Sequence, residues 1–261
     1  MNYLRLFYVF LRIGLMNELA YRANFYVQLL QTLLNLATAL GGLAVIFGHT
    51  ETLGGWQEAE LVALLGVFFL MGGVIGLVIQ PGMERLMGDV RQGTLDFTLI
   101  KPEDAQILVS VGEVRIWKLA DVLLGLIVLA VALFQLGAAV GLRQTLGFAV
   151  ALAAGSAIVY SFWLILATFT FWFVRVENIL IIFQAMYDAG RWPVGIYPRW
   201  LRAALTFLVP VAFAVTVPSE ALVGRLSPQL LVGAVGLAGL LLLGSRLFWK
   251  FGVRHYSGAS A

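Results

Sequence analysis

Long apolar stretches alternate with short polar ones along the 261 residues of this chain. Five of the stretches contain few charges and hold about 20 residues or more, the length that an α-helix needs to cross the hydrocarbon core of a bilayer. They span residues 25–47, 61–80, 119–140, 146–172 and 230–249. The pattern therefore predicts an all-α integral membrane protein in which each stretch is a transmembrane helix.

The part of the chain between the fourth and the last of these stretches allows two interpretations, because its apolar runs are short and interrupted by prolines. In the first, residues 178–197 form an amphipathic segment on the cytoplasmic side and residues 201–217 form the fifth span. In the second, residues 177–195 form the fifth span, and residues 199–222 form a broken helical pair that dips into the outer leaflet. Both interpretations give six transmembrane helices.

The first 22 residues combine arginines seven positions apart with aromatic and aliphatic side chains. Such a segment is typical of a helix that lies in the membrane interface, with its cationic side chains toward anionic headgroups. Residues 1–22 are therefore predicted to form an interfacial helix before the first span.

The longest polar interval covers residues 81–118 and holds eleven of the chain's 31 charged residues. Pro81 and Gly82 are expected to end the second span, because this dipeptide commonly marks a turn. Residues 81–118 are thus predicted to form a cytoplasmic loop that contacts a partner in water.

The first span carries a polar stripe whose members are three or four residues apart, so that they share one helical face. The stripe consists of Asn24, Gln28, Gln31, Asn35 and Thr38. An unpaired amide is costly in lipid, so this face is expected to point toward protein or water. It is either a packing surface between helices of one bundle, or a subunit interface or part of a substrate path at Gln28, Gln31 and Asn35.

The distribution of charge supports this topology. Only 12% of the residues are charged, about half of the usual share in soluble domains, which is about 25%. With six spans and both termini in the cytoplasm, twelve of the 17 Lys and Arg residues fall on the cytoplasmic side and five outside. This bias follows the positive-inside rule and explains the basic character of the chain without a nucleic-acid partner.

Several kinds of chemistry are excluded by the sequence. The chain has no cysteine, two distant histidines, no G-x-x-x-x-G-K-[ST] and no H-E-x-x-H, so it offers neither a P-loop nor a familiar metal or nucleophile site. Acidic residues within the spans are nearly absent; Asp121 is expected near Lys118 at a cytoplasmic mouth, and Asp188 near Arg191. We therefore expect a membrane transport protein that takes its energy from elsewhere, and no metal or cofactor bound to this chain.

Four segments of the chain resemble ABC-2 type transporter permeases, in the subfamily of chains of about this length. They are residues 91–97 (RQGTLDF) followed by Lys101-Pro102, residues 18–25 (ELAYRANF), residues 47–50 and 53–56 (FGHT and LGGW), and residues 196–202 (IYPRWLR) with Pro210. The resemblance extends over essentially the whole chain. It implies six helices after an N-terminal interfacial elbow helix, within a single domain covering residues 1–261.

The resemblance also favours the second interpretation of the fifth span, with residues 199–222 as an outer re-entrant segment before the last span. The residues that it assigns to an outer gate are Tyr197, Pro198, Trp200 and Pro210. It further implies two ABC ATP-binding subunits as partners, which would bind ATP and Mg, and a second ABC-2 permease that is the same chain or a related one.

In these permeases the segment after the second span forms a coupling helix that docks on the ATPase. The matching residues here are Arg91, Gly93, Thr94, Leu95, Asp96, Phe97, Ile100, Lys101 and Pro102. A short helix bounded by Gly93-Thr94 and Pro102 fits this role, with apolar side chains for a cleft and charged ones to fix the register. From the residues alone, an ordinary solvated loop is an equal alternative.

The sequence is thus expected to encode the permease subunit of an ATP-driven exporter in the bacterial plasma membrane. Its cargo would be an amphiphilic or hydrophobic compound such as a lipid, a glycoconjugate or a drug, and membrane lipids would surround it. The alternatives are a membrane-embedded enzyme that modifies lipids and a scaffold subunit that transports nothing. The enzyme would need paired acidic or histidine residues at the bilayer surface, which the sequence does not suggest.

Overall fold

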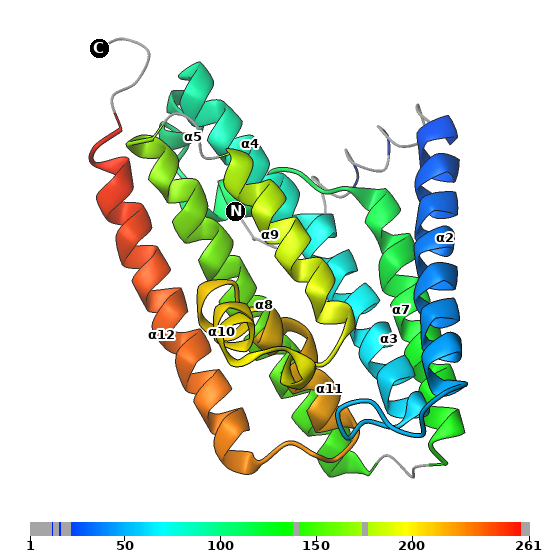
Figure 1. The fold of residues 1–261 in the computed structure, drawn as a ribbon. Helices are drawn as coiled ribbons and strands as arrows, with labels where there is room; N and C mark the ends of the chain where they lie inside the picture. The colour runs from blue at the N-terminus through cyan, green and yellow to red at the C-terminus, as the bar shows by residue number, and fades with distance from the viewer. Residues whose placement is uncertain (1–11, 13–15, 17–21, 138–140, 174–176, 257–261) are drawn as a thin grey trace.

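A computed structural model describes residues 12, 16, 22–137, 141–173 and 177–256 of the chain, and the helices in these residues run mostly side by side (Figure 1). The α-helices are α2 (Arg22–Phe47), α3 (Glu58–Val74), α4 (Gln80–Gln92), α5 (Asp96–Leu99), α6 (Ala105–Val111), α7 (Leu119–Gln135), α8 (Leu142–Thr168), α9 (Glu177–Asp188), α10 (Arg199–Ala203), α11 (Val217–Leu222) and α12 (Pro228–Val253). The interfacial helix predicted over residues 1–22 lies almost entirely outside the described residues.

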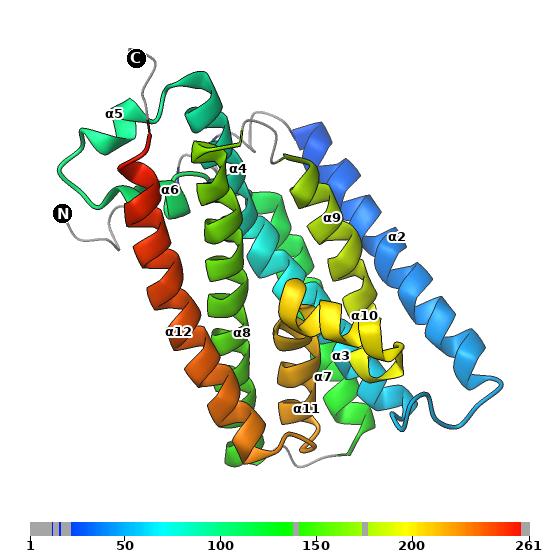
Figure 2. The same ribbon diagram turned by 60° about the vertical axis from the view of Figure 1, so that its left-hand side comes forward.

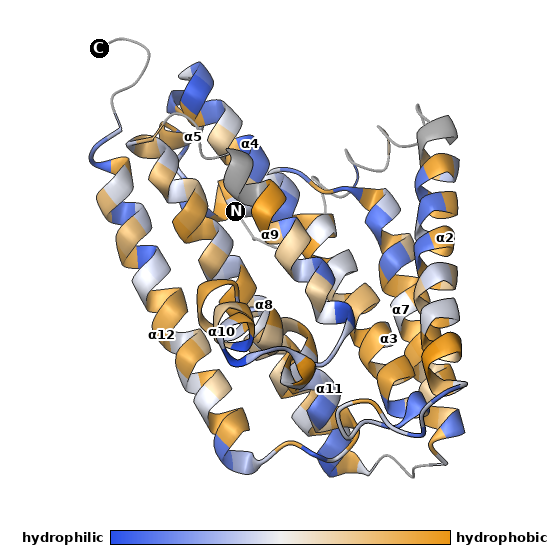
Figure 3. Cartoon of the chain, in the orientation of Figure 1, coloured by the Kyte–Doolittle hydropathy of each residue, from blue (hydrophilic) through white to orange (hydrophobic). Residues whose placement is uncertain are grey.

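The long helices confirm the all-α membrane class. Five of the described helices are long and apolar enough to cross a bilayer, or six if a bent pair in residues 199–222 counts as one span. Apolar residues predominate along α3, α7, α8 and α12, whereas α4 is more hydrophilic (Figure 3). The chain is therefore a multi-pass membrane protein.

The two ends of the bundle differ. The start of α2 and the end of α12 lie at the same end as α4, α5 and α6, as two views show (Figures 1 and 2). The turns that join α2 to α3 and α11 to α12 lie at the opposite end. We call these two ends the α4–α6 end and the opposite end.

The second span does not end at Pro81, as the sequence had led us to expect. A π-helical turn at Ile75–Ile79 joins α3 to α4, and together they make one continuous helical segment, Glu58–Gln92. Pro81 follows the π-helical turn closely, and such local adjustments satisfy the backbone groups that a proline inside a membrane helix frees. The helix ends at Gly93, whose φ of 69° is the left-handed conformation that favours glycine. The predicted loop 81–118 is accordingly mostly helical, comprising most of α4 together with α5 and α6.

The third and fourth spans also differ from their predicted bounds. Helix α7 ends at Gln135 rather than at residue 140, because Gly137 turns the chain with a φ of 57°. Helix α8 begins at Leu142, four residues earlier than expected, where the Gln144 side chain accepts a hydrogen bond from the Gly141 N–H (2.8 Å) and closes its first turn.

The segment after α8 contains a bent helical pair, which is either one broken span or a re-entrant segment. Helix α9 is followed by two helical stretches, Arg199–Leu208 and Ala212–Leu222, which are bent by 79° at a break that contains Pro210. Because Pro210 cannot continue a regular helix, the first interpretation, with residues 201–217 as the fifth span, requires that span to be bent. The break is buried, and the N–H of Val209 still reaches the carbonyl of Ala204 (2.9 Å), so the backbone is satisfied inside the protein.

Helices α3 and α7 form the closest helix pair of the core. A Cβ placed on Gly125 of α7 would overlap the backbone nitrogen of Leu70 and come within 2.8 Å of the Gly66 carbonyl oxygen. One placed on Gly73 would come within 2.7 Å of the Val122 nitrogen. Without a side chain at these positions the two backbones touch, which is how helices gain dispersion energy in a membrane.

We predict that Gly125→Ala lowers the stability of the protein in detergent by about 1–3 kcal/mol, because the added methyl group has no space between α3 and α7. The measurement is the midpoint of thermal unfolding. Gly236→Ala in α12 is the matched control, since a Cβ there meets nothing within 4 Å. Alanine is also the better helix former, so equal midpoints for the two variants would show that the α3–α7 contact is looser than described.

Candidate functional site

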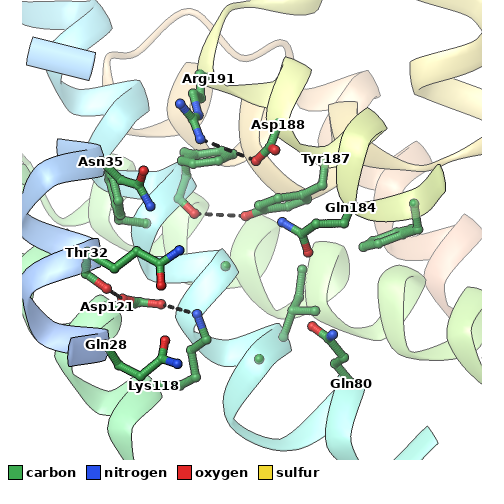
Figure 4. A pocket seen from close by; sticks show the side chains of 17 residues that line it. Gln28, Thr32, Asn35, Gln80, Lys118, Asp121, Gln184, Tyr187, Asp188 and Arg191 are labelled. Atoms are coloured by element: carbon green, nitrogen blue, oxygen red, sulfur yellow. Dashed lines mark hydrogen bonds and ion pairs between the residues drawn. The ribbon is translucent and has the colours of Figure 1, made fainter. Parts of the chain in front are cut away.

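A polar cavity of about 360 Å³ lies within the bundle, between α2, the α3–α4 segment, the start of α7, and α9 (Figure 4). Its lining includes the first half of α2 and the first turn of α7, both of which start at the α4–α6 end. The cavity therefore lies in the half of the bundle nearer to that end. We call it the polar cavity.

Five carboxamide side chains line the polar cavity. They are Gln28, Gln31 and Asn35 from α2, Gln80 from α4 and Gln184 from α9. The amides of α2 lie across the cavity from those of α4 and α9 (Figure 4). The three residues that the polar stripe singled out are thus brought together in one site, whereas Thr38 bonds to its own backbone at Leu34 (2.8 Å) and does not line the cavity.

A buried carboxylate on one side of the polar cavity joins α2 to the start of α7. Asp121 is 8% exposed, and its two oxygens accept hydrogen bonds from Lys118 Nζ (2.7 Å) and from Thr32 Oγ1 (2.6 Å). The pairing of Asp121 with Lys118 agrees with the prediction. Thr32 was missed, although its position four residues after Gln28 places it on the same face of α2. Because both charges are paired, removal of either would leave the other uncompensated in the membrane.

An aromatic wall closes the side of the cavity formed by α3 and α9. The rings of Phe68 and Tyr187 stack with centroids 4.9 Å apart, and the Tyr187 hydroxyl donates to the Phe68 carbonyl (2.8 Å). Gly72 makes room for this ring, since a Cβ there would lie 3.4 Å from it. The Arg191 guanidinium lies 5.5 Å from the Phe68 ring centre and 3.5 Å from Asp188, the ion pair expected from the sequence.

Helix α5 presents two apolar side chains to solvent at the α4–α6 end. Phe97 is 68% exposed and Ile100 is 79% exposed. Leu95, which was grouped with them as a docking residue, is fully buried in the hydrophobic core and is not available to a partner. The reason is the helical period: Leu95 lies two residues before Phe97, on a different face of the short helix.

The start of α5 is fixed by the end of α4. After Gly93, the Thr94 N–H donates to the Asp89 carbonyl (2.9 Å) and its hydroxyl to the Asp89 carboxylate (3.1 Å). Asp96 is partly exposed in the first turn of α5. The three remaining residues of the predicted set, Arg91, Lys101 and Pro102, are exposed. The set therefore forms one surface, apart from Leu95.

A polar network ties α6 to two long helices. Arg246 of α12 forms a two-pronged ion pair with Asp104, in which Nη1 lies 2.9 Å from Oδ1, and it also donates to Gln106 Oε1 (2.7 Å). Gln106 in turn donates to the Tyr160 hydroxyl of α8 (3.0 Å), which lies 2.8 Å from Ser110 Oγ. The sequence gave no signal for this network, because its members are 50 to 142 positions apart.

The hydrogen bond from Arg246 holds the pKa of Asp104 below its usual value of 3.8, despite partial burial. A carboxylate with a lowered pKa stabilises the fold at pH values above its ordinary pKa, and this stabilisation is lost as the pH falls through the lowered pKa. The ion pair between α6 and α12 is therefore fully formed at neutral pH.

At the opposite end, the four residues predicted for an outer gate do not form one cluster. Tyr197 donates to the Ala189 carbonyl (2.9 Å) and Pro210 is buried in the bend, whereas Pro198 and Trp200 are exposed, Trp200 to 72%. The residue that fixes this end was missed: Arg225, which follows α11, pairs with Glu60 of α3 at 2.6 Å.

In the part of the chain that the structure describes, no three acidic, histidine or cysteine side chains are grouped so that they could hold a metal ion. The candidate sites therefore consist of the polar cavity and the exposed face of α5.

Comparison with known families gives one match. The model of a family described as ABC-2 family transporter protein matches residues 33–260. No curated protein and no solved structure matches the chain.

We predict that Arg246→Met loosens α6, since it leaves the Asp104 carboxylate and the Gln106 side chain without their shared donor, at a cost of about 1–3 kcal/mol. Hydrogen–deuterium exchange of the α6 amides should become faster than in the wild type. Lys250→Met, which removes an exposed cation one turn further along α12, is the control and should leave this exchange unchanged. Equal exchange in both variants would mean that the network does not hold α6.

Proposed function

Since the chain belongs to the ABC-2 family of transporter proteins, we propose that it is the permease subunit of an ATP-driven exporter for an amphiphilic or hydrophobic compound. Membership of the family makes the chain a membrane-embedded transport subunit rather than an enzyme, and it implies an ATP-binding partner. The direction of transport, the class of the cargo and the composition of the complex are parts of the proposal.

The polar cavity is the observation that carries the proposal. Amides and an ion pair on membrane-spanning helices are costly where they meet lipid, and in membrane proteins such groups commonly mark the path of a substrate. Four separate helical segments contribute to the lining, and its volume is within the range of small-molecule sites, about 300–1,000 Å³. We propose that Gln28, Gln31 and Asn35 lie on the translocation path.

The charge distribution supports export. The described Lys and Arg residues that lie in or next to α4–α6, or near the end of α12, are Arg85, Arg91, Lys101, Arg115, Lys118, Arg246, Lys250 and Arg254. By the positive-inside rule this end faces the cytoplasm, with both termini on that side of a bacterial plasma membrane. Because the polar cavity lies in the same half, cargo would enter it from the inner leaflet or the cytoplasm and leave toward the outside.

The exposed face of α5 fits a docking surface for the ATP-binding subunits. Phe97 and Ile100 are large apolar side chains held in water by a short helix, which is unusual unless a partner covers them. Exposed Arg91 and Lys101 flank this apolar pair. They would pair with acidic residues of the ATP-binding subunit and so fix the position of α5 on it. Two ATP-binding subunits, which carry the ATP and Mg, would drive the pair of permeases.

A second ABC-2 permease, the same chain or a related one, would cover the seam between α2 and α9. The membrane-spanning part of α2 is only 6% buried, and its Tyr26 and Leu30 are exposed. On α9, Ile181 and Ile182 are exposed as well. All four lie on the two helices that also carry cavity residues, so a second permease against these helices would shield the path from lipid.

We keep the outer gate as a proposal for the bent pair, residues 199–222. Its break at Pro210 is buried, and the ion pair of Arg225 with Glu60 joins the chain after it to the start of α3. Movement of this segment would open the route outward. Within it, Trp200 and Pro198 would contact lipid or the partner permease, since both are exposed.

We predict that affinity purification of the tagged chain in mild detergent recovers an ATP-binding-cassette subunit, identified by mass spectrometry. The double variant Phe97→Ala, Ile100→Ala should lose most of this recovery, because truncation of two interface anchors costs several kcal/mol, at about 2 kcal/mol or more each. Phe134→Ala, which truncates an exposed aromatic residue at the opposite end of α7, is the control and should retain it.

Two results would count against the proposal. Recovery of the chain alone, even after cross-linking at α5, would contradict the proposed ATP-binding partner. In inverted membrane vesicles that contain the purified complex, ATP in the bath should drive cargo into the lumen; ATP-driven movement out of the lumen would contradict export.

We predict that a second permease lies against α2 and α9. Because the chain has no cysteine, Leu30→Cys and Ile181→Cys can each be labelled with benzophenone maleimide and irradiated in membranes. Both should yield a cross-linked product of about twice the mass, whose second chain is this one or a related permease. Val232→Cys on α12, equally exposed to lipid, is the control and should not. Cross-links from Val232 alone would place the interface elsewhere.

A further inference from the structure

The chemistry of the polar cavity indicates which kind of cargo it accepts, and this inference rests on the function proposed above. We propose that the cavity selects an amphiphile with an uncharged, hydroxyl-rich head group, such as a glycosyl group. The head group lies among the amides of the cavity, and its tail remains at the apolar seam between α2 and α9. Three features of the lining lead to this assignment.

The first feature is the five carboxamides. Each amide offers two N–H donors and a carbonyl acceptor, and a sugar hydroxyl both donates and accepts, so the two groups pair in either sense. Since the amides come from α2, α4 and α9, they surround a ligand rather than contact one edge. Neutral hydrogen bonds from several directions recognise a polyhydroxylated group and add no net charge.

The second feature is that the charges of the lining already have partners. The cavity contains two cations and two anions, paired as Lys118 with Asp121 (2.7 Å) and Arg191 with Asp188 (3.5 Å). Since two cations face two anions, the charges of the lining sum to zero, and a phosphate or carboxylate head group would add a charge that the lining does not balance. The lining therefore disfavours a strongly charged head of either sign, since an unbalanced charge between membrane helices is costly.

The third feature is the aromatic wall. The stacked rings of Phe68 and Tyr187 offer an apolar face beside the amides, which suits the C–H faces of a sugar ring. A quaternary ammonium group would also favour aromatic faces. Here, however, the Arg191 guanidinium already lies over the Phe68 ring, 5.5 Å from its centre, and it would repel a second cation. The wall therefore discriminates between these two classes of ligand.

The seam supplies the place for the tail. Leu34 on α2 and Ile181 on α9 are exposed, and each lies three residues from a cavity residue, Gln31 and Gln184, and so beside it on the helix surface. A head group in the cavity and a hydrocarbon chain along these residues satisfy both halves of an amphiphile, with the polar part out of lipid.

The test uses amphiphiles that share an octyl tail and differ only in the head: octyl glucoside, octyl sulfate and octyltrimethylammonium. The protein, in nanodiscs of phosphatidylcholine, carries Asn35→Cys at the edge of the cavity as the sole thiol. The rate of maleimide labelling is measured against the concentration of each amphiphile, below its micellar range. We expect octyl glucoside to slow labelling at lower concentrations than the two charged compounds.

Two further variants tie the protection to the cavity. Gln28→Leu and Gln184→Leu should each raise the half-protecting concentration of octyl glucoside about fivefold, the loss expected for one neutral hydrogen bond. Gln229→Leu makes the same exchange at an exposed position outside the cavity and should leave that concentration unchanged. A thiol at Val232 on the lipid-facing side of α12 should show no protection, which separates binding from a general effect on the bilayer.

The outcomes separate this inference from the proposed function. Equal or stronger protection by octyl sulfate or octyltrimethylammonium, or protection that is insensitive to Gln28→Leu and Gln184→Leu, overturns the assignment of a neutral head group. Neither result affects the recovery of an ATP-binding subunit, on which the exporter function depends. Conversely, glucoside-specific protection without any ATP-binding partner would support the binding site for a neutral head group and contradict the ATP-driven function.

Discussion

The cost of leaving a polar group unpaired in hydrocarbon governs this structure. Lipid offers no hydrogen bonds, so each buried charge and each break in a helix must be satisfied within the protein. Asp121 meets this condition with Lys118 and Thr32, and the broken backbone near Pro210 meets it by burial and by the bond from Val209 to Ala204. Where the amides of α2, α4 and α9 face one another, the same condition creates a space that a polar ligand or water must fill.

The helices that line this space are held by different means on its two sides. On one side, Gly66, Gly73 and Gly125 bring the backbones of α3 and α7 into contact and make a rigid wall. On the other, only 6% of the membrane-spanning part of α2 is buried, and α9 is a short helix. A path with one fixed and one adjustable wall suits a transporter, because movement of α2 or α9 changes the cavity without disturbing the core.

The ends of the bundle are joined to its long helices by ion pairs between residues far apart in the chain. Asp104 before α6 is bound to Arg246 of α12, and Gln106 connects α6 to Tyr160 of α8. At the opposite end, Arg225 connects the bent pair to Glu60 of α3. These contacts join α6 to α8 and α12, and they join the bent pair to the start of α3.

The sequence by itself determined the class of the protein, the approximate positions of its long helices and the polar face of α2, because apolar length and a repeat of three to four residues are local properties. It also indicated the short helix after Gly93, since glycine in the left-handed conformation ends α4. The prediction that the second span ends at Pro81 was wrong, because a π-helical turn before it lets the helix continue. Such a turn has no clear local sequence pattern.

Only the tertiary structure decided that Leu95 is buried while Phe97 is exposed, that Thr32 reaches Asp121, and that Arg246 reaches Asp104 across 142 positions. The physical reason is that burial and side-chain pairing depend on which helices are neighbours. In a membrane this is set by the fit of small residues such as Gly125 against another backbone, which hydropathy does not encode.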